Sequence, residues 1–256
     1  MNEDSPRRQR HRGIYLLPNL FTTAALFSGF YAIVAAINGR YEAAAIAVFV
    51  AMVLDNLDGR IARMTQTTSD FGAEYDSLAD MVSFGVAPAL IMYEWALAGM
   101  ADIGWLPAKL GWLAAFIYTA AAALRLARFN TQLGHADKRF FQGLPSPVAA
   151  AIMVGLVWLA QDLTVEGRQL LWLAFLLTIG CGLLMVSNIL YYSFKEIDFR
   201  GRVPFVTVLA IVLVFVLASI DPPKVLFTVV LCYGLSGPLL TLWRYRQRLR
   251  RRGRQD

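Results

Sequence analysis

Residues 43–59 read AAAIAVFVAMVLDNLDG, an apolar run that ends in two aspartates and a glycine. Eight apolar stretches of this kind lie along the 256-residue chain, near 20–38, 41–58, 81–101, 107–127, 144–160, 169–192, 203–220 and 225–243. A helix needs about 20 apolar residues to cross ~30 Å of hydrocarbon. Charged residues make up 16% of the chain, whereas soluble proteins contain about 25%. The sequence therefore predicts an all-α polytopic membrane protein with about eight transmembrane helices.

The basic residues are distributed unevenly between the predicted loops. With an even number of spans, 20 of the 24 Lys and Arg residues fall on one side of the membrane and four on the other. Basic loops favour the cytoplasmic side, so both termini are predicted to be cytoplasmic. The net charge of +6 arises largely from basic tails that flank the first and last apolar runs. This placement favours contact with anionic lipid headgroups over nucleic-acid binding.

Four aspartates lie at the facing ends of two predicted helices. Asp55 and Asp58 end the apolar run quoted above, and Asp76 and Asp80 lead into the next one. Each pair shares a helical face, and consecutive helices joined by a short loop are usually neighbours. Four uncompensated carboxylates would repel one another at the membrane boundary. We therefore predict a site for a hard divalent cation, Mg²⁺, Mn²⁺ or Ca²⁺; helix capping or pairing with nearby arginines is the alternative.

Two residues that follow the first aspartate pair are suited to bind phosphate. Gly59 allows a ligand to approach the backbone closely, and Arg63 can donate a forked pair of hydrogen bonds to a phosphate. With the predicted metal site, they indicate a pyrophosphate or phosphodiester substrate. A divalent cation transporter is a remote alternative, because acidic residues within membranes mark ion pathways. Transport sites tend, however, to lie at the midplane in repeated halves, and no internal repeat is visible.

The acidic segment reads Asp55-x2-Asp58-Gly59-x2-Ala62-Arg63-x8-Gly72-x3-Asp76-x3-Asp80. It resembles the signature of the CDP-alcohol phosphotransferase family, whose members are integral membrane enzymes, at every fixed position. LPNLFT at residues 17–22 resembles the motif that precedes the first span of the family. LRLARFN at 124–130 and FQGLPSP at 141–147 resemble the branch of the family in which L-serine is the acceptor.

The resemblance implies that an alcohol attacks the lipid-side phosphorus of CDP-diacylglycerol and that CMP leaves. L-Serine is the expected alcohol; glycerol 3-phosphate, inositol phosphate and choline are alternatives, because the signature alone does not choose the acceptor. Two divalent cations, Mg²⁺ or Mn²⁺ with Ca²⁺ as a further option, would be held by the four aspartates, and Asp80 would also be the general base. Residues implied to bind CDP-diacylglycerol are Asn19, Thr22, Asp58, Gly59, Arg63 and Ser69. Residues implied to bind serine are Arg125, Arg128, Asn130 and Ser146.

The resemblance also implies a homodimer in a bacterial inner membrane, in contact with membrane lipids, and the charge asymmetry predicts an active site that faces the cytoplasm. Together they predict four segments: a basic cytoplasmic N-terminal tail (1–13), a catalytic membrane domain (14–192), two additional C-terminal transmembrane helices (193–243) and a basic cytoplasmic C-terminal tail (244–256). For Arg125 and Arg128 an alternative stays open: they anchor the end of a transmembrane helix on the cytoplasmic side, where basic residues accumulate.

Overall fold

A computed structural model describes residues 16–65, 69–132, 140–192 and 205–252. The predicted N-terminal tail, the segment 193–204 and the last four residues lie outside the described residues, so the predictions for them stay predictions.

Most of the described chain is helical. The α-helices are α1 (Leu16–Ile37), α2 (Tyr41–Thr65), α3 (Asp70–Asp80), α4 (Ala87–Trp95), α5 (Trp105–Gln132), α6 (Ser146–Asp162), α7 (Leu171–Val186), α8 (Phe205–Ile220) and α9 (Pro222–Arg252). A π-helical turn at Met81–Val86 joins α3 to α4, and 3₁₀ turns cover Leu97–Asp102 and Gly167–Leu170.

Four of the described helical segments are long and apolar enough to cross a membrane: Asn19–Ile37, Trp105–Thr131, Gly167–Val186 and Pro222–Trp243. They support an integral membrane protein. The other predicted apolar stretches also fall on helices but do not meet both criteria. The helix α2 ends in a charged segment, and α6 and α8 have only 17 and 16 residues.

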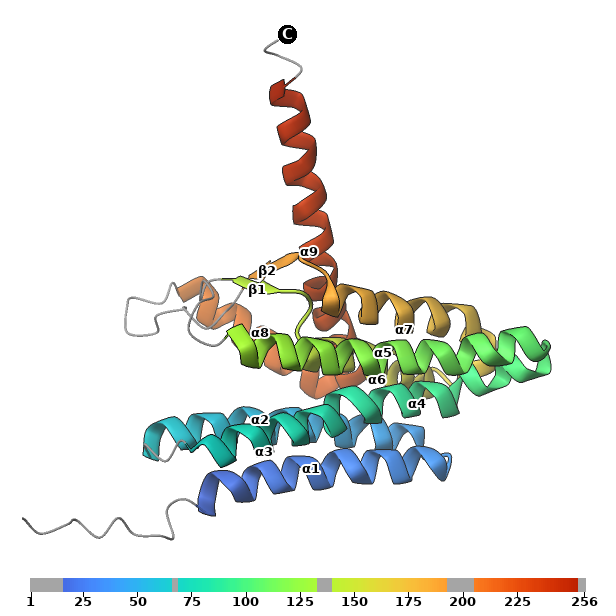
Figure 1. Cartoon of the computed structure of the whole chain (residues 1–256), viewed down its shortest axis with the longest axis horizontal. Helices are drawn as coiled ribbons and strands as arrows, with labels where there is room; N and C mark the ends of the chain where they lie inside the picture. Colours follow the sequence, from blue (N-terminus) through green and yellow to red (C-terminus); the bar gives the residue numbers. More distant parts are fainter. Residues whose placement is uncertain (1–15, 66–68, 133–139, 193–204, 253–256) are drawn as a thin grey trace, which may run out of the picture.

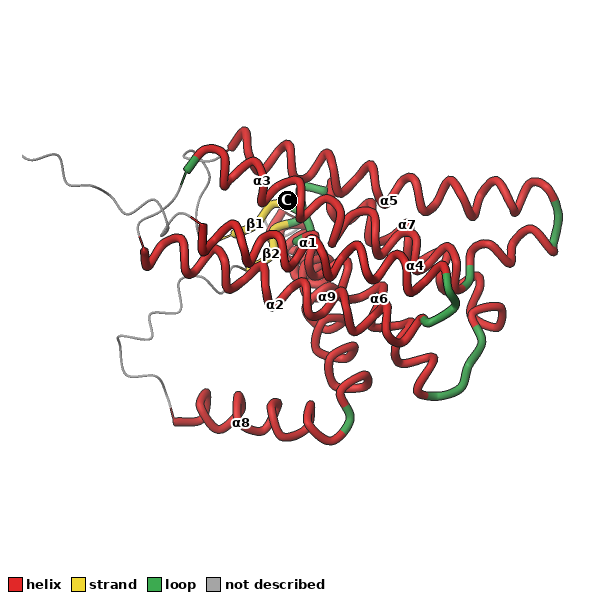
Figure 2. The backbone as a smooth tube through the Cα atoms, turned by 90° about the horizontal axis from the view of Figure 1, so that it is seen from below, coloured by secondary structure: helices red, strands yellow, loops and turns green. Residues whose placement is uncertain are grey.

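Helices α1 to α7 run side by side along the long axis of the molecule, and α9 crosses them steeply (Figures 1 and 2). Within the bundle α1 packs on α2, α5 packs on α7, and α6 packs on α2 and α9. The neighbouring α8 packs mainly on α9. Hydropathy predicted an apolar stretch at 225–243, but α9 has 31 residues and continues through most of the predicted C-terminal tail. Its direction was not predicted either, because direction is set by packing against other helices.

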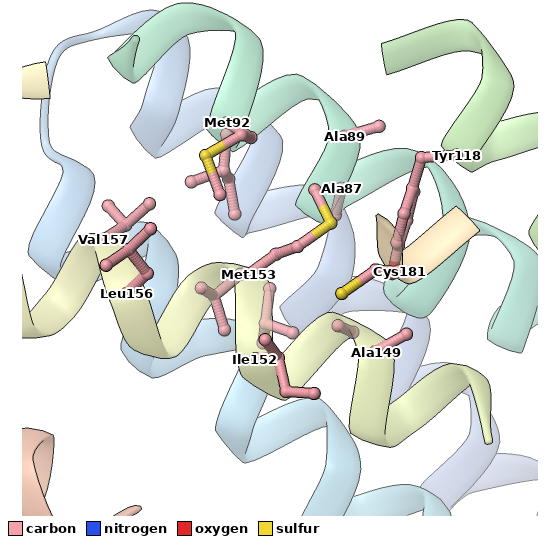
Figure 3. Close-up of a cluster of buried hydrophobic side chains, with 14 of the residues drawn as sticks. Ala87, Ala89, Met92, Tyr118, Ala149, Ile152, Met153, Leu156, Val157 and Cys181 are labelled. Carbon is pink, nitrogen blue, oxygen red and sulfur yellow. The ribbon is translucent and has the colours of Figure 1, made fainter. Parts of the chain in front are cut away.

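Small and flexible side chains build the core of the bundle. Alanines of α1 and α2, among them Ala32, Ala35, Ala44, Ala45 and Ala51, are fully buried. Small residues allow helix backbones to approach closely within a membrane. Deeper in the bundle, Met92, Tyr118, Met153 and Cys181 come together from α4, α5, α6 and α7 (Figure 3). The alanine packing holds α2, which carries Asp55 and Asp58, closely against α1.

A two-stranded antiparallel sheet departs from the predicted all-helical architecture. The strands β1 (Phe140–Gln142) and β2 (Leu190–Tyr192) pair with Gln142 opposite Leu190. Gly143 follows β1 with a φ of +77°, and a Cβ atom there would lie 2.1 Å from the Met185 carbonyl oxygen. Only glycine fits this left-handed, crowded position. The sheet ties the loop after α5 to the segment after α7.

Candidate active site

Three of the four predicted metal ligands come together between α2 and α3. Asp55, Asp76 and Asp80 each offer a carboxylate oxygen, and these oxygens lie within 4.8 Å of one another. All three side chains are half-buried. Oxygens on opposite sides of one ion at ~2.0–2.6 Å would be roughly 4–5 Å apart. The donor set and its spacing therefore fit a hard divalent cation.

The fourth aspartate, Asp58, lies beside this group but is not one of the three. Its side chain is buried, and its Oδ2 accepts a 2.8 Å hydrogen bond from the hydroxyl of Thr22 on α1. The negative charge of Asp58 nevertheless acts on Asp76. Of the four side chains predicted to converge, the structure thus brings three together, and the fourth, Asp58, is hydrogen-bonded to α1.

Burial and mutual repulsion disfavour the ionised form of the carboxyls in the acidic centre. Burial, followed by the negative charges of Asp58 and Asp55, raises the pKa of the Asp76 carboxyl to about 7. Asp76 lies outside the four segments that qualify as membrane spans. A divalent cation would offset both burial and repulsion by favouring the ionised carboxylates.

Local backbone structure places Asp76 and Asp80. Ser69 is the N-cap of α3, and its Oγ accepts a 3.1 Å hydrogen bond from the Gly72 amide in the first turn. The π-helical turn follows Asp80 directly, and such turns are frequent at functional sites. Helices α1 and α5 hold this turn, because Ser83 donates to the Ala25 carbonyl and Tyr118 donates to the Phe84 carbonyl.

The residues predicted to bind CDP-diacylglycerol lie around the ends of α1, α2 and α3. Asn19 approaches Gly72, where an added Cβ would be 3.5 Å from its Oδ1 and 3.2 Å from Ser69 Oγ. Gly59 is exposed, and a Cβ there would meet nothing within 4 Å, so the surface at this point is open. Arg63 belongs to α2, but its side chain lies outside the described residues.

The predicted serine-binding residues lie at the ends of α5 and α6. Arg125 Nη1 donates a 2.8 Å hydrogen bond to the buried Ser146 Oγ. The Arg125 Nε is buried and has no hydrogen-bond partner among the described residues. The Arg125 charge also interacts with Asp80, which links this pair to the acidic centre. Asn130 Nδ2 donates a 3.0 Å hydrogen bond to Ser77 Oγ and so connects α5 to α3.

Arg128 has different surroundings from Arg125. Its guanidinium donates to Gln142 Oε1, at 2.8 Å to Asn188 Oδ1, and more weakly to the Val186 carbonyl. These contacts join α5 to the sheet and to the end of α7. The predicted contact between Arg128 and serine stays a prediction, since the structure shows the guanidinium serving these internal acceptors.

Comparison with known proteins decides the family. Residues 15–186 match the family model described as CDP-alcohol phosphatidyltransferase. The chain belongs to the CDP-alcohol phosphatidyltransferase family. The matched region contains every residue that the sequence predicted for the site, from Asn19 to Ser146.

Curated relatives cover most of this CDP-alcohol phosphatidyltransferase family member. A Helicobacter pylori protein named CDP-diacylglycerol–serine O-phosphatidyltransferase is 37% identical over 224 residues, which cover 87% of this chain and 90% of that protein. A Bacillus subtilis protein of the same name is 34% identical over 183 residues, covering 70% of this chain and 92% of the relative. A Mycobacterium bovis protein of that name is 36% identical over 190 residues, covering 72% and 63%.

Several residues around the site of this family member were not predicted from the sequence. Ser77 accepts a hydrogen bond from Asn130. Gln142 and Asn188 each accept a hydrogen bond from the Arg128 guanidinium. Gln142 lies within a motif quoted above, but its contact with Arg128 depends on the unpredicted sheet. Asn188 follows α7 and carries no sequence signal that separates it from an ordinary helix end.

Proposed function

We propose that this protein transfers the phosphatidyl group of CDP-diacylglycerol to the hydroxyl of L-serine, giving phosphatidylserine and CMP. The observation that carries the proposal is the convergence of Asp55, Asp76 and Asp80 between α2 and α3. Family membership supports the chemistry, and the names of the relatives support serine as the acceptor.

In the proposed reaction the serine hydroxyl oxygen forms a bond to the lipid-side phosphorus, and the bond from that phosphorus to the CMP oxygen breaks. Asp80 takes the hydroxyl proton as general base, which contributes about 10²–10⁴-fold to the rate in comparable enzymes. Its surroundings support this role, since Asp80 belongs to the acidic cluster and also interacts electrostatically with Arg125.

Four aspartates, Asp55, Asp58, Asp76 and Asp80, would hold the divalent cations, for which we propose Mg²⁺ or Mn²⁺, with Ca²⁺ as a further option, and two ions per site. When bound, such ions neutralise the pyrophosphate and stabilise the departing CMP. Hydrogen bonding by Thr22 fixes the orientation of Asp58. The fit of the oxygen donors supports the proposal.

The nucleotide side of the site is proposed to include Asn19, Thr22, Gly59, Arg63 and Ser69, together with Asp58. The open surface at Gly59 supports close approach of the CDP diphosphate to the backbone. Ser69 and Asn19 flank Gly72 at the start of α3. A site at the end of the helices lets the acyl chains remain in hydrocarbon while the nucleotide remains in water.

The acceptor side is proposed to use Arg125 and Ser146, with Asn130 and Arg128 ordering the surrounding helix ends. A serine zwitterion requires a partner for its carboxylate, and a guanidinium is suited to this contact. A phosphorylated acceptor would require additional basic residues. Purified protein supplied with CDP-diacylglycerol and L-serine, glycerol 3-phosphate, inositol phosphate or choline in turn tests the assignment. We expect CMP release with L-serine, and release with another alcohol but not with serine would refute it.

We further propose eight membrane crossings, cytoplasmic termini, the four segments defined above, a homodimer and a bacterial inner-membrane location with the site facing the cytoplasm. The 20 to 4 division of basic residues supports this topology. Because α9 crosses the other helices steeply, its path through the membrane is the part of this topology that most needs a test. Labelling of single cysteines in the loops of intact cells tests the topology. Labelling of residue 224 and residue 247 from the same side would contradict it.

A further inference from the structure

The last helix, α9, lies beyond the region matched by the family model, which ends at residue 186. It nevertheless packs against the matched region. Gly155 of α6 accommodates Phe227, since a Cβ on Gly155 would lie 3.2 Å from the Phe227 ring. Gly234 similarly accommodates Ile152 of α6. Glycine allows this close approach of two helices, so α9 is held firmly against the helix that carries Ser146.

A pair of tyrosines connects α9 to the small sheet. Tyr191 of β2 is fully buried, and its hydroxyl donates a 3.1 Å hydrogen bond to the Gly234 carbonyl. Its ring contacts the ring of Tyr233, with centroids 5.8 Å apart. A Cβ on Gly237 would lie 2.5 Å from the Tyr191 ring, so this glycine makes room for the ring. These contacts fix Tyr233 on the inner side of α9 (β2 lies beside α9 in Figure 1).

The Tyr233 side chain is linked to the acceptor side of the site through Arg125. The Arg125 guanidinium interacts electrostatically with both the Tyr233 side chain and Asp80. One edge of Arg125 is occupied by Ser146, whereas its buried Nε has no hydrogen-bond partner among the described residues. A buried guanidinium N–H without an acceptor is costly, and a carboxylate is the acceptor that best matches its fork.

We propose that α9 supplies a wall of the acceptor subsite, in which Tyr233 acts with Arg125 to bind the carboxylate of the amino-acid acceptor. The Arg125 Nε edge donates to one carboxylate oxygen, and the Tyr233 hydroxyl donates to the same carboxylate. Tyr233 is thereby a specificity-determining residue that favours an amino acid over an alcohol without a carboxylate. The inference rests on the proposed function, because it requires serine as the acceptor.

The substitution Tyr233→Phe tests the inference, since it removes the hydroxyl and keeps the ring contact with Tyr191. We expect the KM for L-serine to rise about tenfold or more, as for one lost hydrogen bond to a charged group. The KM for CDP-diacylglycerol should not change. The inhibition constant of L-alanine, which has both charges of serine but no hydroxyl, should rise in parallel. Tyr41→Phe is the matched control, because it also removes a tyrosine hydroxyl. The Tyr41 hydroxyl donates a hydrogen bond to the Glu94 carbonyl at the N-terminal end of α2, away from the acidic residues.

A second variant tests the same geometry if Tyr233→Phe does not fold. Gly237→Ala displaces the Tyr191 ring and, with it, Tyr233, so the serine KM should again rise selectively. Gly180→Ala is its control, since a Cβ at Gly180 meets nothing within 4 Å. An unchanged serine KM in a folded variant, or an equal rise for both substrates, would overturn the inference. Absence of serine transfer by the unmodified protein would instead refute the proposed function.

Discussion

The hydroxyl of Thr22 donates a 2.8 Å hydrogen bond to Oδ2 of Asp58, two residues that are 36 positions apart in the chain. Both side chains are buried, with exposed fractions of 4% and 5%. The bond joins the LPNLFT motif at the start of α1 to the acidic signature on α2. Thr22 therefore orients the Asp58 carboxylate, a role that differs from the direct contact with CDP-diacylglycerol implied by the family resemblance.

Replacing Thr22 by valine should weaken metal binding. Removal of a buried donor to a carboxylate costs about 1.5–3 kcal/mol, so the Mn²⁺ concentration for half-maximal binding should rise roughly tenfold or more. Thr22→Ser retains the hydroxyl and should restore binding. Titration of the purified protein with Mn²⁺, followed by electron paramagnetic resonance, measures the change.

Thr178→Val is the control for this experiment, because Thr178 is fully buried and donates only to the Ala174 carbonyl of its own helix. Unaltered Mn²⁺ binding in Thr22→Val, combined with weaker CDP-diacylglycerol binding, would restore the direct lipid contact as the role of Thr22.

Asp80→Asn should nearly abolish turnover and leave CDP-diacylglycerol binding measurable. An amide cannot accept the serine proton, and loss of a general base lowers the rate by about 10²–10⁴-fold. Asp70→Asn, on the exposed first turn of the same helix, should have normal activity. The assay is CMP release under saturating substrates, with lipid binding measured separately. Normal turnover in Asp80→Asn would remove this residue from the role of base.

Gly59→Ala tests whether the substrate approaches the backbone at residue 59, without disturbing the packing of the protein. A methyl group at residue 59 meets no atom within 4 Å, so thermal stability in detergent should not change. We expect the KM for CDP-diacylglycerol to rise about tenfold, which corresponds to a loss of about 1.4 kcal/mol in binding. A normal KM would show that the substrate does not approach the backbone at this position.

Gly143→Ala should destabilise the fold around the sheet. A Cβ there would lie 2.1 Å from the Met185 carbonyl oxygen, and the left-handed backbone itself disfavours alanine by about 1–2 kcal/mol. Gly39→Ala shares the left-handed conformation, with a φ of +71°, but a Cβ there meets nothing within 4 Å. Thermal unfolding should therefore show a much larger loss for residue 143. Equal losses at both positions would contradict the tight contact with α7.

The acidic centre could be predicted because its information is local. Asp76 and Asp80 share a face of α3 because they are four residues apart, and Asp55 lies on the preceding helix, which a short segment joins to α3. The structure brings their oxygens together. Asp58 was predicted as part of the same group. Its bond to Thr22 could not be predicted, because it depends on the relative rotation of α1 and α2.

Features that depend on long-range packing could not be predicted from the sequence. The strands β1 and β2 have three residues each, too few to produce an alternating pattern. The electrostatic interaction of Tyr233 with Arg125 depends on the steep path of α9 across the bundle, and apolar length alone does not fix that path.

The proposed function requires that carboxylates of α2 and α3 hold divalent cations, which enable transfer of a phosphatidyl group to serine. Its most direct test is formation of phosphatidylserine from CDP-diacylglycerol and labelled L-serine by the purified protein, first in EDTA and then with excess Mg²⁺ or Mn²⁺. We predict no product in the chelator and recovery of activity when either ion is restored. Undiminished phosphatidylserine formation in EDTA would contradict the account.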